Sequence, residues 1–521
     1  MLAETEADAA VQPELVFGLV GPLGTDLTLV ASRLSEALAQ VRYRSEVFRL
    51  SRLMHEIPKE PWSLLKDGPR DEEIEEHIRA GNLLRRALDR KDAVAMLGVG
   101  ALREYRFLEL GDQNKPLAGF AAIFHSLKRP EEIETLRRIY GPAFLVLAAY
   151  APRARRVQDL ARRIAESRYS NQTRQFLSKA ESLIATDEEE IDDPFGQNVR
   201  DSFALADVIV NAGDPQSLDA AITRFIDLLF GNTLHTPSRD EQGMYIAHAA
   251  ALRSASLARQ VGVAICRRDG SVVSIGCNEV PRMGGGQYWC GDDPDGRDFQ
   301  LGYDSSDRMR ETLLGDVLDR LRLSGWLSAD KSTLATRDMV VKALREGERP
   351  IMKGAQFTAT VDYVRAVHAE MAAILDAALH GVSTVGCELF TTTFPCHDCA
   401  KHIVAAGIER VVYVEPYPKS LVSELYPDSI QVDSETDCPG KMRIDPFVGI
   451  APRRYAEFFS MQGRKRKEPD GTVAVWRRAK AVPRLPEYLP SVVARLTGEA
   501  EAFKRFENDL KAKIGITEKS E

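Results

Sequence analysis

The sequence lacks any apolar run that approaches the ~20 residues needed by a membrane-spanning helix. Residues 1–13 are acidic and alanine-rich, without the basic and apolar stretches of a secretory signal. The seven cysteines are an odd number and lack the spacing of a disulfide framework. These absences favour a reducing compartment, so we expect a soluble, cytoplasmic protein with no membrane partner.

An excess of positive charge is also missing, because 69 lysines and arginines face 77 aspartates and glutamates, for a formal net charge of −8. This balance argues against a large sequence-independent nucleic-acid surface, although a local basic patch stays open. The composition, 44% hydrophobic and 28% charged, is that of a globular protein. Since single cores rarely exceed about 250–300 residues, a chain of 521 residues should hold two or three domains.

Two short motifs carry the clearest chemistry in the chain. They are His368-x-Glu370 and, further on, Pro395-Cys396-x-x-Cys399. This combination is typical of zinc-dependent nucleobase deaminases. Such a site needs one imidazole, two thiolates, an open fourth position for water and a carboxylate that stays off the metal. We therefore predict one catalytic Zn²⁺ held by His368, Cys396 and Cys399, with Glu370 as the proton shuttle.

The alternatives are a redox pair or half of a structural zinc knuckle for the two cysteines, and a core or surface role for the histidine. The local pattern favours the catalytic site. Apolar residues with helical spacing after Glu370 predict a helix whose first turn contains His368 and Glu370. Residues 385–393 are expected to form a strand and residues 396–406 a helix, with both cysteines on one face at its N-terminus.

The order of the segments predicts two α/β domains. We expect an N-terminal tail at 1–13, a degenerate P-loop nucleotide-kinase-like domain at 14–236, a CMP/dCMP-type zinc deaminase domain at 237–465, and a helical tail at 466–521. In the first domain, strands alternate with helices, which favours a doubly wound sheet. In the second, a hairpin over 261–277 precedes the zinc helices, in the order of a cytidine deaminase-like α/β/α fold.

The first domain opens with a strand, a glycine loop and a helix, which together have the shape of a phosphate-binding P-loop. Its candidate nucleotide-binding residues are Gly21, Gly24, Thr25 and Thr28. An aspartate and a leucine stand where a working motif has glycine and lysine, which disfavours phosphoryl transfer. Three alternatives stay open: a scaffold without nucleotide, a domain that binds a regulatory nucleotide or phosphate group, and an active kinase. The acidic run 187–193 is expected to be a solvated loop.

A second group of residues is expected beside the predicted metal. Asn278 ends the hairpin, where deoxycytidylate deaminases have an asparagine that contacts substrate, and the alternative is an asparagine that caps a turn. The glycines at 284–286, with Tyr288 and Trp289, suggest a loop that contacts phosphate and packs on base or sugar, or an insertion that packs on the first domain. Ala369, within the first motif, completes the predicted substrate-binding set.

Two further features give weaker signals. Cys290, His248 or Cys277 would contribute to a second, structural zinc, but their spacing is not that of a zinc ligand set. Apolar residues between 492 and 514 predict one or two terminal helices, which either complete a core or join an oligomer interface.

The motifs taken together resemble a known family. The zinc segment that starts at His368 looks like a deoxycytidylate deaminase. The whole set resembles the bacterial anti-phage dCTP deaminases of the AvcD type, over roughly residues 14 to 465. Ala372 departs from the asparagine common in deoxycytidylate deaminases, which weakens any transfer of their triphosphate control. The wider resemblance is carried by the degenerate P-loop, the zinc motifs, Asn278-Glu279-Val280-Pro281, the glycine loop with Tyr288 and Trp289, and Tyr417-Pro418-Lys419-Ser420.

The resemblance implies hydrolytic deamination of dCTP and/or dCMP to dUTP or dUMP and ammonia. It also implies depletion of these free deoxycytidine nucleotides during phage infection and restraint by an inhibitory small RNA. A homo-oligomer is expected. Two alternatives stay open: a cytosine or adenosine deaminase acting on tRNA or single-stranded DNA, and a non-catalytic nucleotide or RNA sensor. The acidic net charge counts against the first, and the intact ligand set with Glu370 counts against the second.

Overall fold

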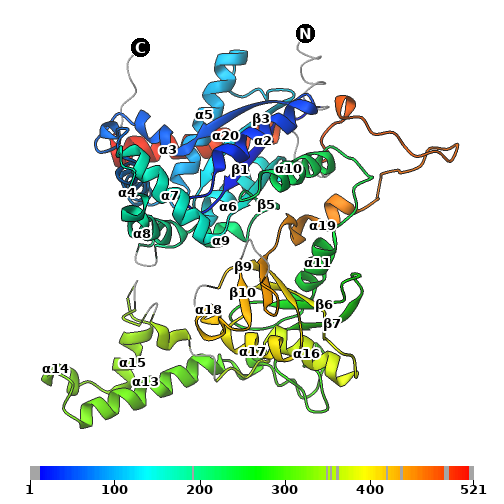
Figure 1. Ribbon diagram of the computed structural model, residues 1–521. Coiled ribbons are helices and arrows are strands. Elements are labelled where there is room, and N and C mark those ends of the chain that lie inside the picture. Colours follow the sequence, from blue (N-terminus) through cyan, green and yellow to red (C-terminus); the bar gives the residue numbers. More distant parts are fainter. Residues whose placement is uncertain are drawn as a thin grey trace. The chain divides into compact units, whose positions relative to one another are not determined.

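A computed structural model describes residues 12–190, 193–347, 350–352, 355–359, 363–417, 420–433, 438–485 and 492–515 (Figure 1). Most of the predicted tail 1–13, as well as Pro418 and Lys419, therefore lies outside the described residues. Contacts divide the chain into two compact units, Met1–Glu241 with Val448–Glu521, and Gln242–Phe447. Each unit combines helices with a six-stranded sheet, so the predicted α/β class is confirmed. None of the described helices has the length and apolar character needed to cross a bilayer.

The sheet of the first unit has the strand order β12-β5-β4-β1-β3-β2. Its pairs are parallel except for β12 and β5, which run antiparallel. Every residue of β1 is buried, as expected for a central parallel strand. The strands alternate with helices as predicted, while kinship to the P-loop kinases stays a prediction. The strands are β1 (Leu15–Val20), β2 (Arg44–Arg49), β3 (Phe120–Leu127), β4 (Phe144–Tyr150), β5 (Val208–Asn211) and β12 (Gly449–Ile450).

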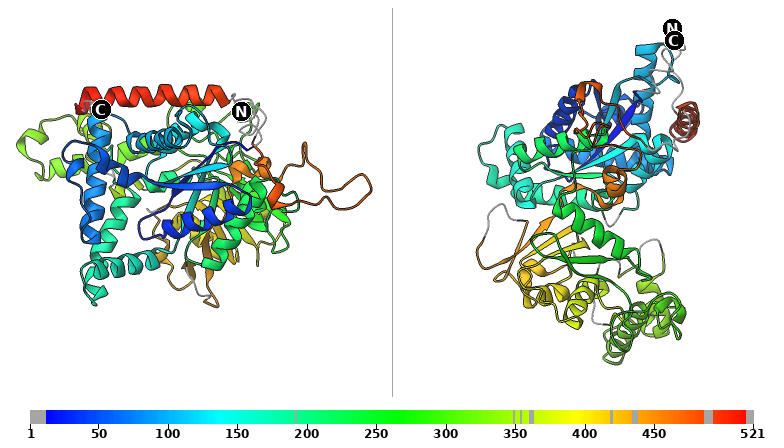
Figure 2. Two further views of the ribbon diagram at one scale, coloured as in Figure 1. Left: turned by 90° about the horizontal axis from the view of Figure 1, so that it is seen from above. Right: turned by 90° about the vertical axis from the view of Figure 1, so that its right-hand side faces the viewer.

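The C-terminal segment contributes three elements to the first unit, whereas we expected the second domain to run to 465 and a tail to follow it. β12 extends the sheet. α19 packs Phe458 against Phe225 of α10, and α20 lies along α5 and α6 (Figure 2). The helices of the unit are α2 (Leu27–Gln40), α3 (Leu50–Leu53), α4 (Arg70–Leu88), α5 (Ala93–Leu110), α6 (Pro130–Tyr140), α7 (Arg153–Ser167), α8 (Leu177–Glu188), α9 (Val199–Phe203), α10 (Pro215–Leu229), α19 (Pro452–Phe459) and α20 (Val492–Asp509).

A buried cluster of charges holds α20 in place. Arg106 of α5 donates to both carboxylate oxygens of Glu499, at 2.6 and 2.9 Å, and its Nε lies 3.1 and 3.2 Å from the two carboxylate oxygens of Glu14. Arg103 also donates to Glu499 at 3.4 Å. Arg106 and Glu499 are each 1% exposed. Because an unpaired charge at such a depth is very unfavourable, these contacts specify where the terminal helix packs.

Replacing Glu499 with alanine should lower the free energy of unfolding of the first unit by about 3–5 kcal/mol, since Arg106 loses one of its two buried carboxylate partners. Pulse proteolysis of the full chain in urea measures this change. Glu501→Ala is the matched control on the same helix, because the Glu501 side chain is 65% exposed; it should change stability by no more than about 0.5 kcal/mol. Equal stability of the two variants would contradict this account of the cluster.

The second unit contains the motif residues. Its sheet order is β10-β11-β9-β8-β6-β7, with antiparallel pairs at β6–β7 and β6–β8 and parallel pairs elsewhere. The predicted hairpin is confirmed as β6 and β7, and the predicted strand at 385–393 as the shorter β8. The strands are β6 (Gly262–Cys266), β7 (Val272–Cys277), β8 (Glu388–Thr393), β9 (Arg410–Glu415), β10 (Ile430–Val432) and β11 (Met442–Pro446).

Two helices of this unit pack on one face of the sheet. Buried residues of α16 and α17 share a core with Val263 and Leu389. Phe390 points to the opposite face, because neighbouring residues of a strand alternate, and it lies against Gly243 of α11. The helices are α11 (Arg239–Ala251), which starts at the boundary of the units, α12 (Asp298–Leu301), α13 (Ser305–Leu323), α14 (Ala329–Ser332), α15 (Thr336–Leu344), α16 (Ala369–Leu379), α17 (His397–Ala405) and α18 (Val422–Leu425).

Gly276 fixes the distance between β7 and the start of α16. A Cβ at this position would lie 2.3 Å from the carbonyl oxygen of Ala369 and 2.5 Å from the backbone nitrogen of Ala373. Both are backbone atoms of the helix and cannot rotate away. Ser274 donates from its hydroxyl to the Ala373 carbonyl at 2.8 Å. The strand therefore holds the first turn of α16 by direct backbone approach.

Candidate metal centre and active site

The three predicted ligands stand at the starts of two helices. His368 immediately precedes α16, Cys396 immediately precedes α17, and Cys399 lies in the first turn of α17. His368 is thus the N-cap of its helix. The prediction from the sequence that it lies in the first turn is therefore wrong. The backbone N–H of Cys399 donates to Cys396 Sγ at 3.4 Å. A helix N-terminus favours negative charge, so this position stabilises a thiolate at Cys396.

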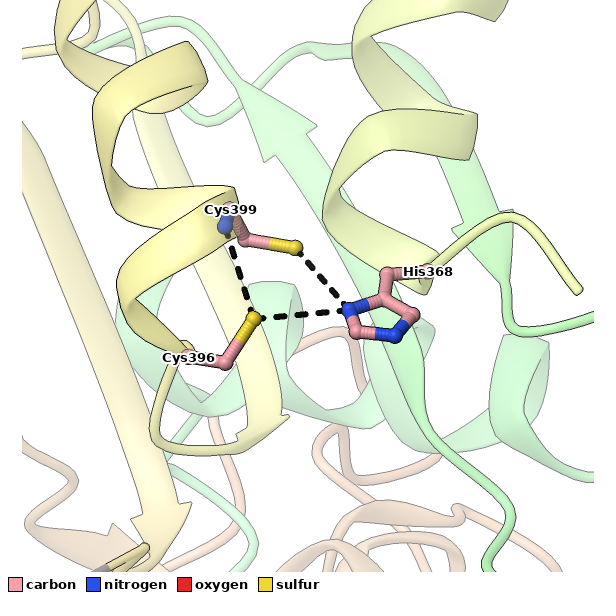
Figure 3. Close-up of side chains that lie close together, drawn as sticks. All are labelled: His368, Cys396 and Cys399. Carbon is pink, nitrogen blue, oxygen red and sulfur yellow. Dashed lines mark hydrogen bonds between the residues drawn. The ribbon is translucent and has the colours of Figure 1, made fainter. Parts of the chain in front are cut away.

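The side chains of these residues point toward one another (Figure 3). His368 Nδ1 lies 3.4 Å from Cys396 Sγ and 3.3 Å from Cys399 Sγ. With Zn–N bonds of about 2.0–2.1 Å and Zn–S bonds of about 2.3 Å, tetrahedral angles place such atoms about 3.5 Å apart. The donor set and its spacing therefore fit Zn²⁺. Three protein ligands leave one coordination position open, as in catalytic zinc sites.

Electrostatics couples the two thiols and the imidazole. The hydrogen bond with Cys399 lowers the pKa of the Cys396 thiol to about 4, and the His368 imidazole adds to this effect. The same hydrogen bond, with burial, raises the pKa of the Cys399 thiol far above its usual value. The hydrogen bond with Cys396 raises the pKa of His368 to about 9. Metal binding at this cluster must therefore release protons, because zinc takes thiolates and a neutral imidazole.

Glu370 lies in the first turn of α16 and is 5% exposed. Burial raises the pKa of its carboxyl group, and the charge of Cys396 adds to the rise. A carboxyl group with a raised pKa is suited to accept and return protons near neutral pH. Glu370 also lines the same cavity as His368 and Cys396. The role of Glu370 as the proton shuttle stays a prediction.

The cavity has a volume of about 450 Å³, within the range of about 300–1,000 Å³ that is usual for small-molecule sites. Its walls come from the segment before β6, the end of β7, the insertion between β7 and α16, and the segments that follow β8 and β9. Apart from the metal-site residues, its polar lining consists of Ser256, Arg259, Asn278, Asp298, Asp304, Ser306, Arg310, Thr358, Thr393 and Tyr417.

Two of the four predicted substrate-binding residues line this cavity. Ala369 is fully buried there. Asn278 lines it as well, but both ends of its side-chain amide contact the backbone. Its Oδ1 accepts from the Val261 N–H at 2.7 Å, and its Nδ2 donates to the Arg259 carbonyl at 2.7 Å. The structure thus shows the turn-capping role for Asn278, and a contact with substrate stays a prediction.

The other two predicted substrate-binding residues lie elsewhere in the unit. Trp289 lines a different cavity of about 600 Å³, which also borders the outer side of α16 at Leu375 and Leu379. The guanidinium of Arg253 lies 3.6 Å from the centre of a Trp289 ring. Tyr288 lines neither cavity and packs beside Gly296. The structure does not bring these two aromatic residues to the metal cluster.

The glycine loop of the first unit contacts carboxylates of its own chain. Asp187 accepts from the Leu23 N–H at 2.7 Å and pairs with Lys128 Nζ at 2.7 Å. Asp187 is 2% exposed, so the expectation of a solvated loop is wrong for this residue. Asp26 accepts a backbone N–H in the first turn of α2. The N–H groups of Leu23 and Leu29 are thus bonded to side chains, and those of Thr25 and Leu27 to backbone carbonyls, instead of being offered to a phosphate.

The four candidate nucleotide-binding residues of this loop and of the start of α2 differ in their surroundings. Gly24 has a positive φ of 90°, and a Cβ there would lie 2.6 Å from the Arg156 carbonyl oxygen. The Gly21 carbonyl accepts from Lys128 Nζ at 3.2 Å. Thr25 is buried and its hydroxyl has no partner among the described residues, whereas Thr28 is exposed. Nucleotide binding by these residues stays a prediction.

A second metal cluster does not form among the described residues. There, the His368, Cys396 and Cys399 group is the one set of at least three His, Cys, Asp or Glu side chains close enough to share a cation. Cys277 is buried and Cys290 is exposed. Arg310 also lines the cavity and lies on α13, in an insertion without a recognisable motif, so no sequence signal pointed to it.

Fold and site together define a class. An α/β unit contains a His/Cys/Cys cluster and a buried glutamate that lines the same cavity as His368 and Cys396, and zinc-dependent nucleobase deaminases use residues of these types. Residues 237–415 match the family model of the cytidine and deoxycytidylate deaminase zinc-binding region. This match supports the cytidine and deoxycytidylate deaminase family for this part of the chain, and zinc as its metal.

Several curated proteins are similar to short segments of the chain. ComE operon protein 2 of Bacillus subtilis (strain 168) is 49% identical over 53 residues, 10% of this chain and 28% of its own length. The deoxycytidylate deaminase of Enterobacteria phage T2 is 48% identical over 54 residues, 10% of this chain and 29% of its own. The probable deoxycytidylate deaminase of Drosophila melanogaster is 39% identical over 82 residues, 15% and 39% of the two chains. The chain therefore spans well under half the length of these relatives.

Solved structures give a weaker likeness. The apo dCMP deaminase of cyanophage S-TIM5 is 17% identical with a TM-score of 0.21, covering 41% of this chain and 100% of that one. The same enzyme in complex with dCMP and dUMP is 18% identical with a TM-score of 0.23, covering 41% and 99%.

Proposed function

We propose that this protein deaminates deoxycytidine nucleotides by zinc-dependent hydrolysis. The observation that carries the proposal is the cluster of His368, Cys396 and Cys399, of which His368 and Cys396 line one cavity together with the buried Glu370. The match to the deaminase zinc-binding region and the similarity to deoxycytidylate deaminases support the pyrimidine substrate. His368, Cys396 and Cys399 would hold the metal through Nδ1 and the two sulfur atoms.

The chemistry divides between the metal and Glu370. When bound, Zn²⁺ is a Lewis acid that lowers the pKa of a water molecule from about 15.7 to about 7. Glu370 would accept a proton from the attacking water, because its carboxyl lines the same cavity as His368 and Cys396 and burial raises its pKa. The water oxygen bonds to C4 of the cytosine ring. Glu370 would pass this proton to N3, then take the proton of the new C4 hydroxyl group and deliver it to the amino group. The C4–N bond would break, so that a uracil nucleotide and ammonia leave.

The finer parts of the proposal rest on the resemblance to the anti-phage dCTP deaminases. They are the use of dCTP as well as dCMP, a role in depleting these nucleotides during infection, an inhibitory RNA partner, a homo-oligomer and a cytoplasmic location. Substrate contacts by Asn278, Ala369, Tyr288 and Trp289 belong to the same set of proposals, as does a regulatory nucleotide or phosphate ligand for the first unit.

Ammonia release from the purified full-length protein tests the proposal. We expect turnover of dCMP or dCTP that exceeds turnover of CMP and CTP, while single-stranded DNA and tRNA stay unchanged. The polynucleotide substrates distinguish the second class of deaminase, which uses the same metal ligands. Deamination of DNA or tRNA with no activity on any free nucleotide would overturn the proposed substrate class.

A further inference from the structure

A positively charged residue of the insertion between β7 and α16 reaches the metal cavity. Arg310 lies on α13, far in sequence from both zinc motifs, yet it lines the same cavity as His368 and Glu370. Its side chain is 27% exposed, so it is partly enclosed without being cut off from solvent. The insertion therefore supplies part of the cavity wall and a guanidinium group in it.

Local contacts hold the Arg310 side chain in this position. Its Nε donates to the Ser306 carbonyl and its NH1 to the Thr358 carbonyl, each at 3.3 Å. The second contact ties α13 to the segment shortly before the first zinc motif. Its NH2 pairs with Asp307 at 2.9 Å, and the Asp307 side chain is 57% exposed. An exposed pair of this kind is worth little, so it can yield to a better anion.

Apart from Glu370 at the metal cluster, two carboxylates line the same cavity, and both already have other partners. Asp298 accepts from Arg365 at 2.6 Å and from the Ser305 hydroxyl at 3.0 Å. Asp304 accepts two backbone N–H groups at the start of α13. A second guanidinium, that of Arg259, lines the cavity, and within the described part of the chain no carboxylate pairs with it.

The pKa of Tyr417 is influenced both by a predicted metal ligand and by the two arginines of the cavity. Burial raises the pKa of its hydroxyl, and the charge of Cys396 adds to the rise, while Arg259 and Arg310 each oppose it. The Tyr417 hydroxyl is therefore close enough to Cys396 and to both arginines to interact electrostatically with all three. One part of the cavity is lined by His368 and Cys396, where the base of a substrate would react. Another part is lined by Arg259 and Arg310, whose positive charges favour an anion.

We propose that Arg310 determines specificity for the phosphorylated form of the substrate by binding its 5′-phosphate group. The inference rests on the proposed deamination and adds the recognition of a nucleotide over its nucleoside. A guanidinium binds phosphate through two parallel hydrogen bonds, which fixes the ligand in orientation as well as in charge. The phosphate takes the place of Asp307 on NH2, while the contacts with Ser306 and Thr358 keep the side chain aimed at the cavity.

Steady-state kinetics of the zinc-loaded full chain with dCTP, dCMP and deoxycytidine tests this role. Arg310→Ala should lower kcat/KM for the nucleotides by about 10- to 100-fold, as expected for the loss of charged hydrogen bonds. Deoxycytidine has no phosphate, so its kcat/KM should stay within about 2-fold of wild type. Arg310→Lys keeps the positive charge but lacks the planar guanidinium, so its kcat/KM for the nucleotides should lie between those of wild type and Arg310→Ala. Arg320→Ala is the control on α13, because its side chain is 75% exposed.

Binding to a Glu370→Gln background separates this inference from the proposed reaction. Equilibrium dialysis should show nucleotide binding that weakens when Arg310 is also replaced, whether or not the wild type turns over. Turnover with an unchanged preference for nucleotides in Arg310→Ala would overturn the role of Arg310 alone. Arg310-dependent binding without turnover would overturn the deaminase proposal alone. An equal loss of kcat/KM on dCTP, dCMP and deoxycytidine would also overturn the role of Arg310, as would the absence of nucleotide binding. Arg310→Lys is the control for folding, because it keeps a long, positively charged side chain at this position.

Discussion

Glu370→Gln should lower kcat for deoxycytidine nucleotides by about 10²–10⁴-fold or more, the usual contribution of a general acid–base group. The amide has nearly the shape of the carboxyl group, so packing in the first turn of α16 is preserved. It cannot accept the proton from water or return protons to N3 and the amino group. Ammonia release in single-turnover and steady-state experiments measures the effect.

The zinc content of Glu370→Gln should match that of wild type, because Glu370 lies outside the cluster of three ligands. Metal analysis of the same preparation therefore separates loss of chemistry from loss of metal. Glu424→Gln is the matched control, since Glu424 is exposed and lines neither cavity. It should keep wild-type kcat. A Glu370→Gln protein with zinc and with kcat within about 10-fold of wild type would refute the assignment.

Cys399→Ser should remove most of the bound zinc and with it all measurable deamination. Cys399 is fully buried and belongs to the core shared by α16, α17 and the sheet. Serine is a poor zinc ligand because its hydroxyl stays protonated near neutral pH, so one of the three metal bonds is lost. At a zinc concentration of 1,000 times Kd, the free energy of unfolding is about 4 kcal/mol higher than that of the metal-free protein, and Cys399→Ser should lose this stabilisation.

Thermal unfolding with and without added zinc measures that loss. Wild type should show a zinc-dependent rise in Tm, and Cys399→Ser should show little or none. Cys387→Ser is the matched control, because Cys387 is a buried cysteine of the same core outside the ligand set. It should bind zinc as wild type does, whatever its own stability. Stoichiometric zinc in Cys399→Ser would contradict the proposed ligand set.

The metal cluster was predictable because its information is local. His368 and Glu370 are two residues apart, Cys396 and Cys399 are three apart, and each pair is placed by the start of one helix. Apolar spacing after Glu370 predicted α16, and the helix predicted at 396–406 matches α17 to within one residue at each end. The close approach of β7 to α16 at Gly276, which fixes the position of the first helix start, is a long-range contact and was not predicted.

The residues that line the rest of the cavity were not predictable in the same way. Arg310 lies on α13, where Leu314 is the one buried residue of that helix and apolar periodicity is weak. Trp289 was expected beside the substrate because its loop follows the hairpin, but it packs on Arg253 at a different cavity. Asp187 sits in an acidic run that looked solvated, and its partners Leu23 and Lys128 are distant in sequence. Each outcome depends on contacts between segments that share no motif.

Zinc removal and restoration test the central claim most directly. Purified protein is stripped with a chelator, its metal content is measured, and ammonia release from dCMP and dCTP is followed as zinc is added back. Deamination should vanish on stripping and return in proportion to bound zinc, reaching a plateau at about one ion per chain, as expected for a single cluster of three ligands. Full activity in the stripped protein, or zinc-loaded protein inactive on every deoxycytidine nucleotide, would contradict the account.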